Sequence, residues 1–289
     1  MSYALHILVM LEIYVLLALS AHQKVGLSGL LTLAHAVFYG LGAYTIALSM
    51  SHFGFGYWTS LIAVVVVCVL VGLLFSAIAN RVRDLYFSIA TLAIQIMFFA
   101  VVYNWVPLTN GPYGIAGIES PSIFGYRLSS PLDFALFGGA WVLIIVLAYR
   151  ALWPSPLFRM IRATRDDQLG MTSLGKDPAY YKGISILFSA VLAGLAGSLY
   201  ATYTSYIDPS SFTLDESILI LSLVLVGGIG RIIGPISGAF IYVLLPELLK
   251  FLQLPDAVAA NMRMILFGFL LILIVRYRPQ GLLGKRLVR

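Results

Sequence analysis

The run YWTSLIAVVVVCVLVGLLFSAIA, residues 57–79, contains no charged side chain. An α-helix needs about 20 consecutive apolar residues to cross roughly 30 Å of hydrocarbon, and this run is long enough. Over the whole chain, 61% of the 289 residues are hydrophobic and only 10% are charged, whereas a soluble domain carries about 25% charged residues. One aqueous core cannot bury so much apolar surface, so the sequence predicts a polytopic membrane protein.

Further apolar runs lie on both sides of this one, at 4–21, 27–50, 85–104, 132–150, 183–203, 215–230, 232–250 and 261–277. Because a membrane helix satisfies its own backbone hydrogen bonds in lipid, the predicted fold is an all-α helix bundle. We expect eight or nine hydrophobic segments in one transmembrane domain that covers 1–289, since the 215–230 run is short. The first run is expected to be a retained span, because it lacks a basic n-region and carries Glu12.

Two groups of residues suggest how the bundle packs. On 183–203, small residues repeat at every fourth position, a pattern that lets helix backbones approach closely: Ala190, Gly194 and Ser198, and Ala193, Gly197 and Ala201. Glycines also gather around two other spans, at positions 26, 29, 40 and 42 and at 227, 228, 230, 234 and 238. One or two spans are therefore predicted to be broken by glycine, as in transporters that bind or gate at such breaks; plain helix packing is the alternative.

The positive charges predict the orientation of the chain. With nine crossings and the N-terminus outside, every Lys and Arg except Arg127, Lys250 and Arg263 falls in a loop on the inner side of the membrane. Lys24 is one of these loop residues. Since positive charges collect in cytoplasmic loops, the loop at 154–183 and the C-terminus are predicted to be cytoplasmic. The loop at 105–131 is predicted to be external. The net charge of +6 then reflects topology, and no nucleic-acid partner is expected.

Motifs for catalysis or for binding a cofactor are missing. The glycine-rich GGIGRIIGP, residues 227–235, lacks the lysine and hydroxyl with which a P-loop holds phosphate and Mg²⁺. The four histidines are scattered, and Cys68 is the only cysteine, so no metal site is predicted. We expect no catalytic residue and no cofactor bound by this chain, which is therefore not predicted to be an enzyme.

Polar side chains inside apolar spans are expensive in lipid and are often functional. Glu12 is predicted either to relay a proton or ion, or to be neutralised against a neighbouring helix. Gln95 and Asn104 are expected to form hydrogen bonds across helices.

A polar-aromatic face is predicted on the second span, where His35 has hydroxyl-bearing neighbours at helical spacing. We expect this face, together with the glycines of the second broken region, to line a substrate pathway, with an interfacial belt or interhelical bonding as the alternative. The candidate pathway residues are Thr32, His35, Tyr39, Tyr44, Gly227 and Gly228.

The most polar interval of the chain is SPLFRMIRATRDDQLGMTSLGKDPAYYK, residues 155–182. Its arginines recur at helical spacings opposite an apolar side, which predicts a short amphipathic helix over 157–174, ended by Gly175. Such a helix lies on a lipid surface or docks into a groove of a soluble protein.

This interval resembles the cytoplasmic coupling loop of the LivM-type permease subunits of ABC importers for branched-chain amino acids. The matching residues are Ser155, Arg159, Ala163, Arg165, Asp166, Asp167, Leu174 and Gly175, while Phe158 replaces a glycine of the family pattern and Gln168 a glutamate. Similar motifs stand at 85–93, 109–118, 189–197 and 227–239. The resemblance therefore extends over most of the chain.

The resemblance implies a permease subunit that carries branched-chain or other hydrophobic amino acids across the bacterial inner membrane. Its implied partners, besides membrane lipid, are a LivH-type permease homologue, an external solute-binding protein and two cytoplasmic ABC ATPases, which use ATP and Mg. The residues implied to couple the permease to the ATPases are Arg159, Arg162, Arg165, Asp166, Asp167, Leu174 and Gly175. The alternatives are a urea or short-amide permease, a proton-coupled carrier that uses Glu12, and a membrane anchor that transports nothing.

Overall fold

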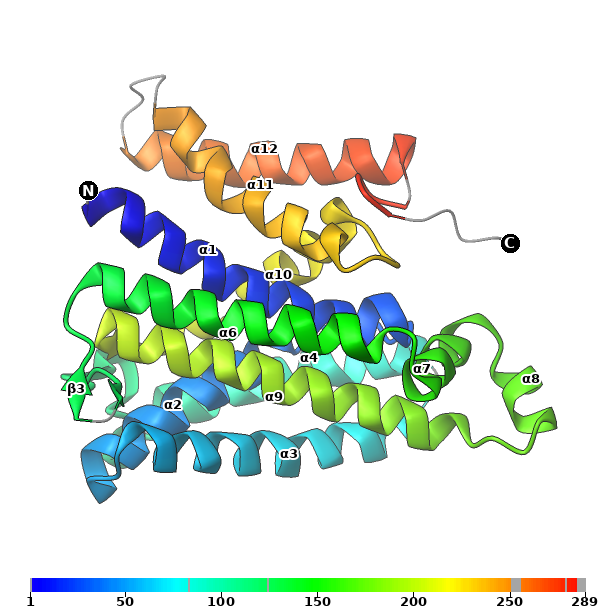
Figure 1. Ribbon diagram of the computed structural model, residues 1–289, viewed down its shortest axis with the longest axis horizontal. Helices are drawn as coiled ribbons and strands as arrows, with labels where there is room; N and C mark the ends of the chain where they lie inside the picture. Colours follow the sequence, from blue (N-terminus) through cyan, green and yellow to red (C-terminus); the bar gives the residue numbers. More distant parts are fainter. Residues whose placement is uncertain (1, 83, 124, 251–255, 279, 285–289) are drawn as a thin grey trace.

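The computed structural model describes residues 2–82, 84–123, 125–250, 256–278 and 280–284. Long helices lie side by side along the longest axis of the molecule (Figure 1). In chain order these are α1 Ser2–Ala21, α2 His35–Phe53, α3 Tyr57–Arg81, α4 Asp84–Asn104, α6 Pro131–Leu152, α9 Pro178–Thr204, α10 Leu214–Gly227, α11 Ile233–Lys250 and α12 Asp256–Tyr277. Shorter elements connect them: the π-helix His22–Leu27, α5 Val106–Thr109, α7 Pro156–Asp166, α8 Gln168–Ser173 and the 3₁₀ turns Gly111–Tyr113 and Pro209–Phe212.

The prediction of a helical membrane protein is confirmed. Within the described part of the chain, five helices are long and apolar enough to cross a membrane: Tyr3–Leu27, Tyr57–Arg81, Leu85–Asn104, Pro131–Leu152 and Pro178–Thr204. They correspond to the runs predicted at 4–21, 57–79, 85–104, 132–150 and 183–203. The first is longer than predicted, because the π-helix continues α1 through residues that the charge pattern places in a loop.

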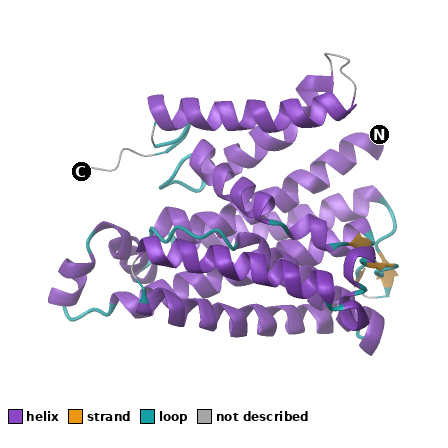
Figure 2. Ribbon diagram, turned by 180° about the vertical axis from the view of Figure 1, so that it is seen from behind, coloured by secondary structure: helices purple, strands orange, loops and turns teal. Residues whose placement is uncertain are grey.

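The span predicted at 27–50 is wrong in its first part. Residues 28–34 form neither helix nor strand, and α2 begins at His35. Figure 2 shows the loops of the chain in teal between the helices. The backbone of the loop 28–34 is held by α4, where the Leu33 amide donates to Thr91 Oγ1 over 3.0 Å and Ser88 Oγ donates to the Leu31 carbonyl over 2.9 Å. These bonds replace the helical bonds that the loop lacks.

The run from 215 to 250 is also interrupted. α10 ends at Gly227, α11 begins at Ile233, and Gly228 and Gly230 between them have positive φ angles of 115° and 93°. The Leu282 and Leu283 amides donate to the Val226 and Gly227 carbonyls over 3.0 and 2.9 Å. The end of α10 is therefore capped by backbone that follows α12.

α9 lies at the centre of the bundle and packs against α1, α2 and α3. A Cβ atom on Gly42 of α2 would overlap the carbonyl of Gly194 on α9, and one on Gly197 would overlap the carbonyl of Tyr39. The two backbones are therefore in direct contact, as the small residues of 183–203 predict.

The external loop predicted at 105–131 contains short strands that the all-α prediction omitted. β1 Ile115–Ala116 pairs antiparallel with β4 Tyr206–Ile207, and β2 Ser122–Ile123 pairs with β3 Tyr126–Arg127. They lie at the end of the bundle opposite α7 and α8 (Figure 1). We call the other end the α7–α8 end.

Basic residues mark the α7–α8 end. Arg81, Arg150 and Arg276 stand in the last turns of α3, α6 and α12, and these three helices finish at that end (Figure 1). The distribution is the one expected if this end faces the cytoplasm. Lys285, Arg286 and Arg289, which contribute to the predicted orientation of the C-terminus, lie outside the described residues.

The direct contact of α2 and α9 makes Gly197 intolerant of a side chain. We expect Gly197→Ala to lower the free energy of unfolding by about 1–3 kcal/mol, because overpacking pushes the two backbones apart. Thermal unfolding of the detergent-purified protein, followed by circular dichroism, measures this cost. Gly268→Ala on α12 is the matched control, since no atom lies within 4 Å of the position that its new Cβ would take; equal stability of both variants would contradict the packing described.

Candidate functional site

α7 begins directly after α6 and is fixed to the bundle by its apolar side. Ser155 caps it, accepting a hydrogen bond from the Phe158 amide, and Pro156 occupies its first turn. Phe158 and Ile161 are fully buried. The Phe158 ring packs edge-on against Tyr149 of α6 and Phe188 of α9, with centroid distances of 5.7 and 6.5 Å. α7 is therefore packed against the bundle through these side chains.

The single helix predicted over 157–174 is two helices. α7 ends at Asp166, and Asp167 adopts extended backbone, with φ −157°, before α8 begins at Gln168. The cause is the Asp167 side chain, whose Oδ1 accepts from the Gly170 amide over 2.8 Å and so caps α8. Gly175 then ends α8 with a φ of 69°, which glycine adopts without strain.

Arg165 connects α7 to the end of α1. Its Nη1 donates to the Gly26 carbonyl over 2.5 Å, and its Nε donates to Asp166 Oδ1 over 3.0 Å. Its stem also covers Gly29, since a Cβ atom there would lie 2.6 Å from Arg165 Cγ. Asp166 thus orients the guanidinium of Arg165, and the guanidinium in turn bonds to the π-helix.

The other predicted coupling residues take different positions. Arg162 stacks on Trp153, with its Cζ 4.8 Å from the ring centroid, and donates to the Trp153 carbonyl. Arg159 and Leu174 are exposed, and Leu169 beside Leu174 is 81% exposed. α8 projects from the α7–α8 end (Figure 1), so its leucines are available to a partner protein.

The π-helix forms a buried polar cluster that the sequence pattern did not predict. His22, Gln23 and Lys24 are all buried, although the charge pattern places Lys24 in a loop. The Lys24 Nζ atom lies 4.7 Å from the centroid of the Phe38 ring and has no hydrogen-bond partner among the described residues. The signal that could have found it is a charge in the short gap between the apolar runs 4–21 and 27–50, because charged residues at membrane depth are functional candidates.

The start of α2 is held by side chains from three other helices. His35 Nε2 and Ser20 Oγ of α1 are 2.5 Å apart. The Ala36 amide donates to Ser217 Oγ of α10 over 2.8 Å, and Ser217 in turn donates to Gln95 Oε1 of α4 over 2.9 Å. Gln95 therefore bonds across helices as predicted.

Asn104 does not bond across helices as predicted. Its Nδ2 donates to the Ala100 carbonyl of its own helix over 2.8 Å. The exposed position of Asn104, four residues after Ala100 near the end of α4, explains this local bond.

The predicted pathway residues fall into two separate groups. Tyr39 and Tyr44 are buried on α2 and contact the Phe212 ring edge-on, at centroid distances of 5.0 and 5.7 Å. Thr32 and His35 are buried at the start of α2 and in the loop before it. This group forms one continuous stretch of the interior.

Gly227 and Gly228 belong to the second group, and both serve close packing. A Cβ atom on Gly227 would overlap the carbonyl of Gly234, and one on Gly228 would overlap the backbone of Gly284. They join α10 to α11 and to the segment after α12. The structure does not bring them together with the tyrosines of α2.

Glu12 lies on α1 against a glycine pair of α6. A Cβ atom on Gly138 would overlap Glu12 Oε2, and one on Gly139 would lie 3.2 Å from Oε1. Oε2 is buried without a hydrogen-bond partner in the described structure. The two glycines make room for this carboxyl. Glu12 therefore lies against a neighbouring helix, as one of its two predicted alternatives requires.

Residues 3–275 match the family described as the branched-chain amino acid transport system permease component. The chain is 33% identical over 297 residues to the high-affinity branched-chain amino acid transport system permease protein LivM of Salmonella typhimurium, covering 95% of this chain and 68% of that protein. For LivM of Escherichia coli the identity is 32% over 294 residues, with 94% and 68% covered. A probable LivM of Methanocaldococcus jannaschii is 25% identical over 327 residues, with 97% and 93% covered. No solved structure matches the chain.

Ser217 is expected to be the side chain on which the start of α2 depends. Ser217→Ala leaves the Ala36 amide and Gln95 Oε1 without this partner, and we expect a loss of about 1–3 kcal/mol in the free energy of unfolding. Ser222→Ala on the same helix is the control, because Ser222 Oγ donates only to the Leu219 carbonyl of its own helix. Thermal unfolding in detergent compares the two, and an equal effect would argue against the bridge.

Proposed function

Because the chain belongs to the family of permease components of branched-chain amino acid transport systems, we propose that it is the membrane-spanning permease subunit of an ATP-driven importer. Its substrates are branched-chain or other hydrophobic amino acids, and its site is the bacterial inner membrane. The observation that carries the proposal is the family match over 3–275. It is supported by α7, whose Arg165 donates to the Gly26 carbonyl of the π-helix.

The subunit works with partners in this proposal. A LivH-type permease homologue forms the other half of the membrane unit, an external solute-binding protein delivers the amino acid, and two cytoplasmic ABC ATPases bind ATP and Mg. The α7–α8 end and the C-terminus then face the cytoplasm, and the loop with β1–β3 faces outside. The basic ends of α3, α6 and α12 support this orientation.

The ATPases contact α8 and the outer side of α7. Support comes from Leu169 and Leu174, which are 81% and 79% exposed on a segment that is otherwise polar. Large apolar side chains exposed on a polar surface mark interaction sites. Arg159 adds an exposed positive charge on α7, Asp167 sets the bend between α7 and α8, and Gly175 ends α8.

Movement of α7 reaches the interior through Arg165. When ATP binding closes the ATPase pair, α7 shifts, and the hydrogen bond to Gly26 passes the shift to the π-helix. The π-helix is a suitable element to respond, because such segments are irregular and recur at functional sites. Loop 28–34 follows it directly and leads to α2, so the shift biases the bundle between inward-open and outward-open states.

The substrate pathway in this proposal runs along α2. Tyr39 and Tyr44, with Phe212 beside them, offer apolar rings of the kind that suit a hydrophobic side chain. Thr32 and His35 supply polar atoms at the broken start of α2, and helix breaks within a membrane protein are where transporters bind polar groups of a solute.

Two variants separate docking from transmission. We expect Leu174→Asp to reduce co-purification of the ATPases at least tenfold, because it places a charge in an apolar contact. Arg165→Gln keeps the exposed face and should leave co-purification unchanged while amino-acid uptake per ATP hydrolysed falls at least tenfold. Uptake of radiolabelled leucine and phosphate release are measured in vesicles that contain the whole importer. Full coupling in Arg165→Gln would contradict the proposed route.

A charge reversal tests the pairing that orients Arg165. Asp166→Arg removes the acceptor of Arg165 Nε and adds repulsion, so we expect it to uncouple uptake from ATP hydrolysis as Arg165→Gln does. Asp166→Asn retains an oxygen acceptor and should keep most of the coupling. Wild-type uptake in Asp166→Arg would show that the pair has no part in coupling.

Glu12 distinguishes the importer from a proton-coupled carrier. We expect Glu12→Gln to retain ATP-driven uptake within about twofold, because a neutral side chain of the same shape fits against Gly138 and Gly139. The measurement is leucine uptake into vesicles with ATP, and into vesicles with an imposed proton gradient and no ATPase. Uptake driven by the gradient alone and abolished in Glu12→Gln would favour the carrier.

A further inference from the structure

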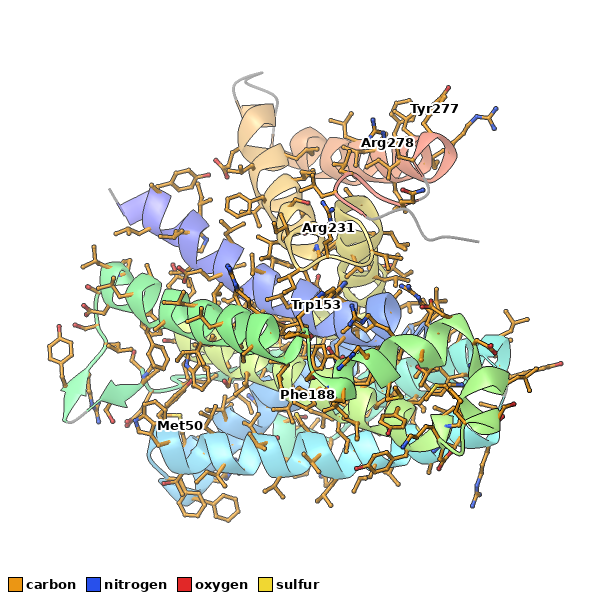
Figure 3. The ribbon with its side chains drawn as sticks, turned by 45° about the vertical axis from the view of Figure 1, so that its right-hand side comes forward. Met50, Trp153, Phe188, Arg231, Tyr277 and Arg278 are labelled. Atoms are coloured by element: carbon orange, nitrogen blue, oxygen red, sulfur yellow. The ribbon has the colours of Figure 1, made fainter. Side chains whose placement is uncertain are left out.

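A hollow with a positive lining opens at the α7–α8 end, and of the residues implied to couple the permease to the ATPases it includes Arg162. It has a volume of about 550 Å³. Its wall combines the last turn of α6, the residues that lead into α7, and the gap between α10 and α11. Trp153 and Arg231, both labelled in Figure 3, come to it from the two sides.

Among the described residues, three arginines and no acidic residue line this hollow. They are Arg150 at the end of α6, Arg162 on α7 and Arg231 between α10 and α11. Arg150 and Arg231 are exposed, and neither forms an ion pair within the described part of the chain. The hollow therefore concentrates positive charge that the described side chains do not neutralise.

Arg162 is held in the orientation that a ligand would need. Its ring-stacked guanidinium donates to the Phe158 and Trp153 carbonyls over 3.3 and 3.2 Å. Burial first, and then the charges of Arg159 and Arg165, lower the pKa of Arg162. An anion in the hollow would relieve this unfavourable environment.

The rest of the lining is apolar. Val146, Ile232, Ile233 and Ile236 complete the wall, and Ile233 is 63% exposed. α6 is long and apolar enough to cross a membrane over Pro131–Leu152, and Arg150 in its last turn then stands near the level of the lipid phosphates. A ligand that fits has a phosphate at this level and hydrocarbon beside it.

We propose that this hollow binds the headgroup phosphate of an anionic phospholipid, with the acyl chains against Ile233 and Ile236. Arginine is suited to the phosphate because its planar fork donates two parallel hydrogen bonds, and basic pockets between membrane helices bind anionic headgroups. The bound lipid joins α7 to the α10–α11 gap, two elements that the coupling route does not otherwise connect. This site is additional to the proposed transport function and does not depend on it.

Mass spectrometry of the intact, detergent-purified chain tests the site with dioleoyl phosphatidylglycerol and, as a neutral lipid, dioleoyl phosphatidylcholine. We expect preferential binding of phosphatidylglycerol, weakened about fivefold by Arg231→Gln and further by Arg150→Gln/Arg231→Gln, since each arginine near an anionic surface contributes about that factor. Arg81→Gln is the matched control, an exposed arginine in the last turn of α3 that does not line the hollow. It should bind phosphatidylglycerol as the wild type does.

Several results would overturn the proposal. Equal binding of both lipids, or an equal loss in Arg81→Gln, would mean that the arginines form no specific site. Displacement of phosphatidylglycerol by millimolar inorganic phosphate would indicate a site for a free anion. Unchanged lipid binding with loss of ATPase co-purification would assign the hollow to protein docking. If the double variant unfolds at a lower temperature, the lipid binding of the single variant Arg231→Gln decides the test. Arg231 is exposed in an irregular segment, so its replacement is not expected to change the fold.

Discussion

Between Leu27 and His35 the backbone leaves helical geometry, and Ser28, Leu30, Thr32 and Ala34 of this segment are buried where water does not replace the missing hydrogen bonds. Unpaired backbone groups in such surroundings cost several kcal/mol each. Ser88 and Thr91 of α4 bond to the backbone of Leu31 and Leu33, and Ser217 of α10 accepts from the Ala36 amide in the first turn of α2. These bonds fix α4 and α10 relative to the start of α2, so the positions of the buried tyrosines and of the π-helix follow from them.

The end of helical geometry after Leu27 also provides the backbone group that α7 contacts. A regular helix leaves no free carbonyl in its middle, whereas the end of the π-helix presents the Gly26 carbonyl to Arg165. Gly29, with φ 72°, then turns the chain beneath the arginine stem, a conformation that glycine adopts most easily. One side chain therefore contacts both sides of the turn that joins α1 to α2.

The sequence predicts the long helices well and the break poorly. The uninterrupted apolar run at 57–79 forms α3, Tyr57–Arg81, because length and hydropathy decide a span. Residues 28–34, SGLLTLA, are as apolar as the spans around them, and the side chains that bond to their backbone from α4 are Ser88 and Thr91. Such bonds between distant residues leave no local pattern, which is why the predicted span begins eight residues before α2 does.

The candidate site shows the same division. The arginines of 155–182 predict an amphipathic helix, but helix orientation decides that Arg165 points to Gly26 while Arg159 is exposed. Asp167 looks in the sequence like one more charge of that helix, yet its capping bond to Gly170 divides the helix in two. Lys24 looks like a loop residue because only the three-dimensional packing reveals that the π-helix buries it.

The crossing of α2 and α9 has a mechanical consequence. Interlocking side chains resist the movement of one helix over another, because the ridges of each fill the grooves of the other. Gly42 of α2 and Gly197 of α9 leave no ridge at this crossing. A crossing of this kind is suited to act as a pivot, because α2 can turn about it while its backbone stays in contact with α9. A displacement at one end of α2 would then become an opposite displacement at the other end, so a single contact would reverse the direction of motion across the thickness of the bundle.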